Sequence, residues 1–261
     1  WFHQILSGQN PDIFTNVVDP RIPYYYTDQL VPGEAAENPA EYQEADGFLS
    51  IHFGSSHPNQ AGNQASSSTA IGMYPCGGWY DDGSGTTISA STGTGVAPER
   101  MLTNYARLYI EAELALDGGS TEDARELLVE AMEASFAKVN QVATRMGSSQ
   151  TIPELTLDSS TYLIPVLNAF DDGDLERKKE VIMTQKWIAS FGYNVDAYTD
   201  YRRTGYPIMF DANTDVGPFA AFTSSSPYMV SLPWRSEDLN LNPNAPDQKN
   251  VFQDQVFWDI D

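Results

Sequence analysis

The side chains best suited to chemistry lie in one loop, where aromatic rings stand beside carboxylates. The stretch from Gly47 to Tyr80 holds no charged side chain, and two aspartates follow it directly. Sugar rings present C–H faces that stack on flat side chains, while their hydroxyl groups hydrogen-bond to amides and carboxylates. The pattern would suit a carbohydrate-binding loop, but packing of the same rings on the scaffold is the default interpretation of loop aromatics. The candidate ligand-binding residues are Tyr74, Trp79, Tyr80, Asp81 and Asp82.

Catalytic chemistry finds little support in the same region. The Cys-Gly-Gly-Trp run that begins at Cys76 is similar to a cysteine-protease nucleophile, but all three histidines precede it, whereas the histidine of that mechanism follows. His52, His57 and Cys76 could supply three metal ligands, yet their spacing fits no helical ligand pair such as His-Glu-x-x-His. We therefore predict neither a catalytic residue nor a metal ligand.

Cofactor motifs are also missing from the sequence. The Gly-Ser-Gly run at Gly83 and the Gly-Thr-Gly run at Gly93 lack the context of phosphate-binding loops. Residues 171–174 fail the spacing of a helix–loop–helix calcium site, because Phe170 and Lys179 stand where ligands belong. No cofactor is predicted, and no motif supports a structural Ca²⁺. Since the chain has 36 acidic residues, a carboxylate pair for glycoside hydrolysis stays open as an alternative.

Composition narrows the class of protein. The 261 residues include 36 acidic and 14 basic side chains, which gives a formal net charge of −22. This charge repels phosphate backbones and anionic lipid surfaces, so we expect no nucleic-acid partner. The single cysteine rules out an intramolecular disulfide. No run approaches the roughly 18 apolar residues that a membrane helix needs. The chain starts abruptly on apolar residues without a secretory signal, so we expect a soluble fragment of a longer protein.

A pair of helices is predicted after a loop-rich region that covers residues 1–97. Apolar residues at i, i+3, i+4 and i+7 predict a helix over residues 98–117, with Leu102 on its apolar face. The Gly118-Gly119 pair ends it, and Ser120 or Thr121 caps a second amphipathic helix. Because the turn is short, the two helices should pack antiparallel.

Two further helices follow. Asp172-Gly173-Asp174 is a cap for a largely buried helix that runs from 175 to 191, and Asn194 caps a short helix that ends at Thr204-Gly205. Arg202 and Arg203 follow the acidic residues of that short helix, so one guanidinium could pair with a carboxylate bidentately and fix the following turn. We expect this arrangement, and Trp187, to serve the scaffold rather than a ligand.

Residues 182–207, which read IMTQKWIASFGYNVDAYTDYRRTGYP, resemble the signature of one SusD-like branch of the SusD/RagB family. The family pattern is a buried Gln-Lys-Trp-Ile-Ala helix, then an acidic residue with Ala and an aromatic, then Asp-Tyr-Arg-Arg-Thr-Gly-Tyr-Pro. Residues 185–189 and 200–207 match it throughout, and Tyr198 stands where the family often has Trp. The structural signature comprises Gln185, Lys186, Trp187, Asp200, Arg202, Arg203, Gly205 and Pro207.

Weaker similarities to the same family occur in the expected order. Residues 19–22 resemble its Asp-Pro-Arg-Leu motif, residues 105–115 its Ala-Glu-Ala helix, and residues 232–244 its closing segment. The closing segment departs from the pattern at Trp234 and at Ser236-Glu237. Family members are also considerably longer, with a signal peptide, a lipidated cysteine and further helix pairs.

The resemblance implies a mainly α fold, in which tetratricopeptide-like helix pairs form an α/α superhelical scaffold with long irregular loops. Residues 1–97 would pack on the helical scaffold of residues 98–261 as one structural domain. The implied function is non-catalytic binding of glycans or other nutrients, on a lipid-anchored, outward-facing protein of the outer membrane. Its implied partner is a SusC-like, TonB-dependent transporter. A glycoside hydrolase and a helix-repeat protein-interaction module remain the alternatives.

Overall fold

The computed structural model describes residues 1–38, 42–51, 66–76, 97–145, 154–193, 195–209 and 229–257. Helices dominate the described residues and the strands are two residues long, so the predicted mainly α fold is confirmed. In chain order the elements are α1 (Phe2–Leu6), α2 (Ile22–Tyr25), β1 (Tyr26–Thr27), β2 (Tyr42–Gln43), β3 (Leu49–Ser50), β4 (Ala70–Ile71), α3 (Met73–Cys76), α4 (Asn104–Asp117), α5 (Thr121–Arg145), the π-helical turn η2 (Ser159–Leu163), α6 (Ile164–Asp171), α7 (Leu175–Ala189), α8 (Val195–Thr204) and α9 (Ser236–Leu241).

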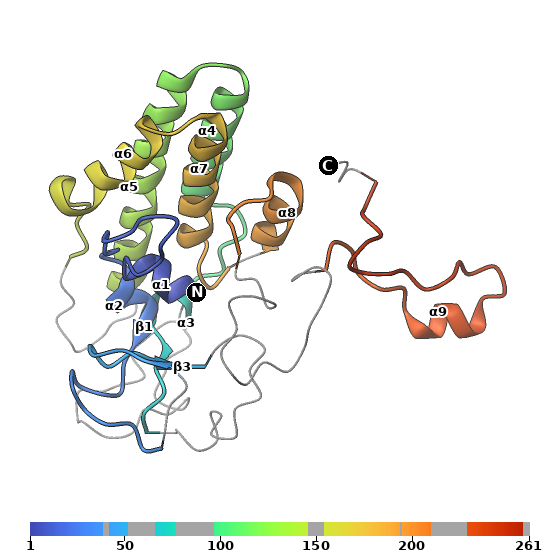
Figure 1. Ribbon diagram of the computed structural model, residues 1–261, viewed down its shortest axis with the longest axis horizontal. Coiled ribbons are helices and arrows are strands. Elements are labelled where there is room, and N and C mark those ends of the chain that lie inside the picture. The colour runs from blue at the N-terminus through green and yellow to red at the C-terminus, as the bar shows by residue number, and fades with distance from the viewer. Residues whose placement is uncertain are drawn as a thin grey trace.

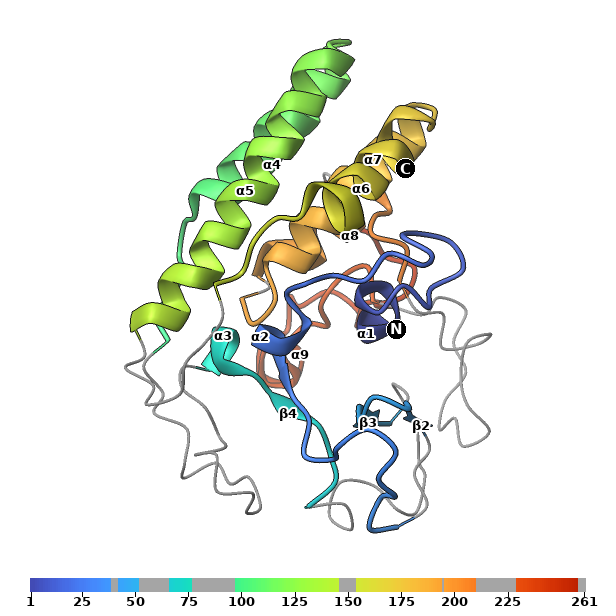
Figure 2. The same ribbon diagram turned by 90° about the vertical axis from the view of Figure 1, so that its left-hand side faces the viewer.

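The long helices form two neighbouring pairs. α4 and α5 are antiparallel across the predicted glycine turn, where Gly119 has a φ of +86°. Figure 2 shows α6 and α7 as a second pair beside the first, and α7 contacts both α4 and α5. The interface is apolar, with Tyr109, Ala112, Leu128 and Val181 fully buried. α4 therefore buries one apolar stripe against the other helices, whereas α7 is buried on more than one side, as its sequence predicts.

α4 begins later than the sequence suggests. It starts at Asn104 rather than near Pro98, because Thr103 has extended backbone angles and its side chain accepts a hydrogen bond from the Ala106 amide at 3.2 Å. Leu102 consequently lies outside the helix and is 96% exposed, so its assignment to the buried face is wrong. The Thr103 cap, and not Pro98, therefore sets the start of this helix.

The second pair begins with an element that periodicity missed. η2 and α6 together span only 13 residues, from Ser159 to Asp171, and their apolar side chains Tyr162, Val166 and Phe170 are buried. Asp158 caps this segment: its Oδ1 atom accepts hydrogen bonds from the Thr161 amide at 2.6 Å and the Ser160 amide at 2.9 Å. The cap fixes where the second pair starts.

The Asp158 cap should make the segment acid-sensitive. Hydrogen bonds from the Thr161 amide and hydroxyl, and from the Ser160 hydroxyl, lower the pKa of Asp158 to about 2. Because the folded pKa is depressed, the stabilisation is present above the unfolded pKa of about 3.9 and is lost as the pH falls towards 2. Carboxyl chemical shifts followed against pH should give this low value. In Asp158→Asn the contribution of this carboxylate to acid unfolding should disappear, so stability should fall less steeply between about pH 4 and pH 2 than in the parent chain. A normal Asp158 pKa in the parent chain would contradict the assignment.

The N-terminal region packs beyond one end of the helix pairs (Figures 1 and 2). β1 pairs antiparallel with β4, with Tyr26 opposite Ile71, and β2 pairs antiparallel with β3, with Tyr42 opposite Ser50. One core of buried residues runs from Ile5 to Ala189, so α1, α2 and α3 share it with the long helices.

The C-terminal tail contributes little to this core. Figure 1 shows the segment that carries α9 extending away from the helix pairs, and none of the α9 residues is buried. The tail is tethered at α8, where the Tyr198 hydroxyl donates to the Met229 carbonyl at 2.7 Å. Within the described ranges, no helix combines the length and apolar character that a bilayer crossing requires.

Candidate functional site

The loop selected from the sequence is only partly described. Tyr74 lies in α3 and is fully buried, so its ring belongs to the core and is not open to a ligand. It stacks on Tyr25 with ring centroids 5.4 Å apart, and the Arg100 guanidinium lies 4.2 Å from its ring. Burial raises the pKa of the Tyr74 phenol. The other four candidates, Trp79, Tyr80, Asp81 and Asp82, lie outside the described residues, as do His52 and His57.

Gln185 of the signature belongs to a buried polar cluster around Arg21, which is 0% exposed. Arg21 binds both carboxylate oxygens of Asp19, with Nη2 to Oδ2 at 2.6 Å and Nε to Oδ1 at 2.9 Å. It also donates to the Tyr162 hydroxyl at 2.8 Å, to Ser135 Oγ at 3.0 Å and to Gln185 Oε1 at 3.2 Å. Two segments that resemble the family, 19–22 and 185–189, therefore meet in one network that ties the N-terminal region to α5 and α7.

Lys186, Asp200 and Arg203 form a second network, which holds α8 in place. Lys186 Nζ contacts Asp200 Oδ2 at 2.7 Å, and both side chains are buried. Arg203 donates to Asp200 at 3.1 Å and binds both oxygens of Glu113 on α4, with Nη2 to Oε2 at 2.8 Å. The hydrogen bond to Glu113 and the charges of both carboxylates raise the pKa of Arg203. The expected bidentate arginine pair is present, and its partner is Glu113.

The end of α8 is closed by the last signature residues. Gly205 has a φ of +71°, which favours glycine, and its amide donates to the Tyr201 carbonyl at 2.8 Å. The Tyr206–Pro207 peptide bond is cis. The Thr204 hydroxyl donates to the Asp200 carbonyl at 2.7 Å and accepts from the Tyr206 amide at 3.1 Å. These contacts give the chain a defined turn away from α8.

The remaining signature residues, Trp187 and Arg202, pack against other segments of the chain. Trp187 is half-buried and meets Phe2 edge to face, with centroids 4.6 Å apart. The Arg202 guanidinium lies 4.2 Å from the Tyr198 ring and donates to the Val230 carbonyl at 3.3 Å. Both side chains therefore hold segments of this chain together, Trp187 at α1 and Arg202 at the C-terminal tail.

A groove of about 740 Å³ runs along α4 and is a candidate ligand site in the described part of the chain. Its volume lies within the usual range for small-molecule sites, about 300–1,000 Å³. Its walls come from α4, from the segment before α4, from the turn between α7 and α8, and from the first turn of α8. The lining residues are Arg100, Met101, Leu102, Thr103, Asn104, Tyr105, Ala106, Arg107, Ile110, Glu111, Leu114, Ser190, Tyr193 and Asp196.

The groove combines an apolar surface with a polar edge. Leu102, Ile110 and Leu114 are exposed within it. Beside them, Arg107 binds both carboxylate oxygens of Glu111 at 2.5 Å, and the Tyr193 hydroxyl donates to the Met101 carbonyl at 3.5 Å. Such a surface can stack an apolar ligand face while its edge hydrogen-bonds to hydroxyl groups.

Both the signature and α3 position this groove. The Arg203–Glu113 pair fixes α8, and with it Asp196, against α4. On the other side, α3 packs closely on the turn after α7. Gly192 in this turn has no side chain, and a Cβ atom placed on it would lie only 2.3 Å from Pro75 Cβ of α3. α3, which immediately precedes the Trp79–Asp82 loop in sequence, therefore lies against the Arg100 end of the groove.

Sequence reasoning missed the groove and one group of side chains that could hold a metal ion. Ile110 and Leu114 are four residues apart on the exposed face of α4, and this second apolar stripe was the available signal. Among the described residues, the side chains that could hold a metal ion together are His3, Glu44 and Asp46, none of which lines the groove. His3 is separated from the two carboxylates by about forty residues, so spacing alone could not reveal the group.

Comparison with known proteins identifies a family. Residues 13–253 match the family described as SusD-like, Susd and RagB outer membrane lipoprotein. A SusD homologue from Bacteroides thetaiotaomicron superposes with a TM-score of 0.50 at 18% identity, over 86% of this chain and 42% of that one. A SusD homologue from Bacteroides uniformis gives a TM-score of 0.52 at 17% identity, over 93% of this chain and 47% of that one. The chain thus spans less than half the length of these structures, and no curated protein matches it.

Proposed function

Because this chain belongs to the SusD-like family of Susd and RagB outer membrane lipoproteins, we propose that it captures glycans, or nutrients of similar chemistry, without transforming them. The family match over residues 13–253 is the observation that carries this proposal. In the full-length protein, a lipid anchor would hold the binding surface outside the outer membrane. A SusC-like, TonB-dependent transporter would then receive the ligand.

The α4 groove and the Trp79–Asp82 loop are the proposed ligand surface. The groove offers apolar side chains for the C–H faces of a sugar, with the polar groups of Asn104, Ser190 and Asp196 at its edge. The loop follows α3, which touches the Arg100 end of the groove, so Trp79 is placed in sequence to extend the surface. An extended surface of this kind suits an oligosaccharide better than a single sugar.

A glycoside hydrolase is the competing function, since Glu111 and Asp196 both line the groove. Hydrolysis needs one carboxylic acid that donates a proton and a second carboxylate across the scissile bond. Glu111 is already bound through both oxygens to Arg107, which leaves it poorly placed to serve as the proton donor. We therefore favour binding over hydrolysis.

One experiment on the 261-residue chain distinguishes capture from hydrolysis. Binding of a panel of oligosaccharides is measured by calorimetry, and reducing ends are quantified in the same mixtures over several hours. Capture predicts saturable binding with no release of reducing ends, whereas a hydrolase would release them. Failure to bind any glycan would contradict the proposal and favour the protein-interaction module.

Trp79→Ala tests the loop once a ligand is found. Loss of a stacking tryptophan should weaken binding by about 10-fold or more. Tyr193→Ala tests the groove in the same way, and Trp234→Ala is the matched control, because Trp234 is an exposed ring on the C-terminal tail and does not line the groove. Unchanged affinity in Trp79→Ala would remove the loop from the ligand surface while leaving the family assignment intact.

A further inference from the structure

His3 is a buried histidine whose ring is held from several sides. It lies in α1 and is 4% exposed. Its ring stacks on Phe48, with centroids 3.5 Å apart and planes 11° from parallel, and meets Tyr26 edge to face at 5.5 Å. These contacts leave the imidazole little freedom to rotate, so the directions of its two nitrogens are set by packing.

One nitrogen of this ring is occupied by a carboxylate. Nδ1 of His3 lies 3.0 Å from Glu44 Oε1, the arrangement of an N–H donor and a carboxylate acceptor. Glu44 is itself held by the Tyr42 hydroxyl on Oε1 and by Gln9 Nε2 at 2.7 Å on Oε2. With the proton on Nδ1, the lone pair of the neutral imidazole is on Nε2.

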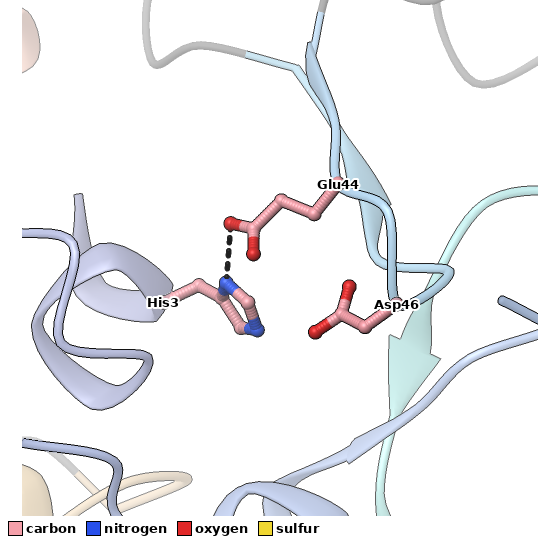
Figure 3. A group of neighbouring side chains, drawn as sticks. All are labelled: His3, Glu44 and Asp46. Carbon is pink, nitrogen blue, oxygen red and sulfur yellow. Dashed lines mark hydrogen bonds and ion pairs between the residues drawn. The ribbon is translucent and has the colours of Figure 1, made fainter. Parts of the chain in front are cut away.

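The second nitrogen has no such partner. Nε2 of His3 is buried and makes no hydrogen bond to any described residue. Figure 3 shows the Nδ1 side of the ring facing Glu44 and the Nε2 side facing the Asp46 carboxylate across a gap. One ligand atom from each of His3, Glu44 and Asp46 lies within 4.8 Å of the others. A buried nitrogen without a partner is costly, and a bound ion would satisfy it.

The turn between β2 and β3 presents the two carboxylates. Glu44 follows β2, its amide donates to the Phe48 carbonyl at 2.8 Å, and Gly47 has a φ of +113°. Asp46 lies at the tip of this turn and is exposed, and its Oδ1 atom accepts from the Phe48 amide at 3.2 Å. The exposed Asp46 can shift by the small distance that joint coordination requires, because two donors on one zinc ion lie about 3 to 4 Å apart.

We propose that His3 Nε2 and the Asp46 carboxylate bind a divalent transition-metal ion of the Zn²⁺ class, with Glu44 as the carboxylate that orients His3. Imidazole nitrogen favours Zn²⁺ and similar ions, whereas Ca²⁺ takes oxygen ligands. A carboxylate on the opposite imidazole nitrogen is the usual second contact of a metal-bound histidine. Water would complete the coordination sphere on the exposed side. The site goes beyond the proposed capture of nutrients and stands independently of it.

Metal titration of the 261-residue chain tests this site. Metal-free protein is titrated with Zn²⁺, Ca²⁺ and Mg²⁺ separately by calorimetry, and Co²⁺ is added to a further sample for its visible absorption spectrum. One Zn²⁺ should bind per chain, Ca²⁺ and Mg²⁺ should bind at least about 10-fold more weakly, and Co²⁺ should show bands of nitrogen and oxygen coordination. Absence of Zn²⁺ binding, or Ca²⁺ binding as tight as Zn²⁺ binding, would overturn the proposal.

Matched variants locate the bound ion. Asp46→Asn keeps an oxygen for the Phe48 amide but removes the charged ligand, so Zn²⁺ affinity should fall by about 10-fold or more. Asp12→Asn makes the same charge change at an exposed residue outside the group and should leave affinity unchanged. His3→Phe keeps the stack on Phe48 and should abolish binding. If His3→Phe fails to fold, Asp46→Asn still decides, since equal Zn²⁺ affinity in Asp46→Asn and in the parent chain would rule the site out.

Discussion

Arg21→Met should destabilise the chain by about 3 to 5 kcal/mol, the loss typical when one partner of a buried ion pair is removed. Arg21 is 0% exposed and Asp19 is 2% exposed, so the substitution leaves a carboxylate inside the protein without its cation. Ser135, Tyr162 and Gln185 lose the same donor. The free energy of unfolding is measured by urea denaturation, followed by far-ultraviolet circular dichroism.

Arg125→Met is the control for this prediction. Arg125 pairs with Asp171 at 2.8 Å, but both side chains are more than 40% exposed, so its loss should cost about 1 kcal/mol or less. Equal destabilisation by the two substitutions would show that the Arg21 cluster contributes no more than a surface pair.

Asp200→Ala should cost about 3 kcal/mol, because it leaves the buried Lys186 ammonium without its partner. Arg203 would lose one of its two carboxylate partners, but it is 41% exposed and still bound to Glu113, so its share of the cost is small. Lys179→Met on α7, the helix that carries Lys186, is the control, since Lys179 pairs with the exposed Asp117 and should change stability by about 1 kcal/mol or less. Denaturant unfolding measures both variants.

The double variant Lys186→Met/Asp200→Ala tests the cause. If the cost of Asp200→Ala comes from an unpaired charge, removing that charge should recover part of it, so the double variant should be more stable than the sum of the single losses predicts. Strict additivity would mean that the two side chains act separately. Since α8 carries Asp196 into the α4 groove, Asp200→Ala should also weaken any ligand bound there.

These networks show how residues of the signature motif hold parts of the chain together. Gln185 and Lys186 are adjacent on α7, yet one joins the Arg21 cluster and the other joins Asp200 on α8. The motif therefore fixes α7 against two different parts of the chain at once. The residues that line the groove lie outside the motif, apart from Ser190 and Tyr193 in the turn after α7 and Asp196 in the first turn of α8.

The sequence by itself determined the helices, because their signals are local. The Gly118-Gly119 stop, the Asp174 cap and the apolar periodicity each act within a few residues, and α5, α7 and α8 begin close to where these signals place them. The same locality explains the errors. Pro98 favours a helix start, but the Thr103 cap decides the start of α4, and the eight residues of α6 are too few for a clear period.

Only the tertiary structure decided which side chains meet. Arg21 reaches Gln185 across 164 residues, and His3 reaches Glu44 across 41, and no spacing rule connects such distant positions. Tyr74 carries the residue type of a ligand platform, yet Tyr25 and Arg100 enclose it. Leu102 belongs to an apolar pattern, yet it lies in an open groove. Residue type sets what a side chain can do, whereas long-range packing sets whether it faces the core, a neighbour or solvent.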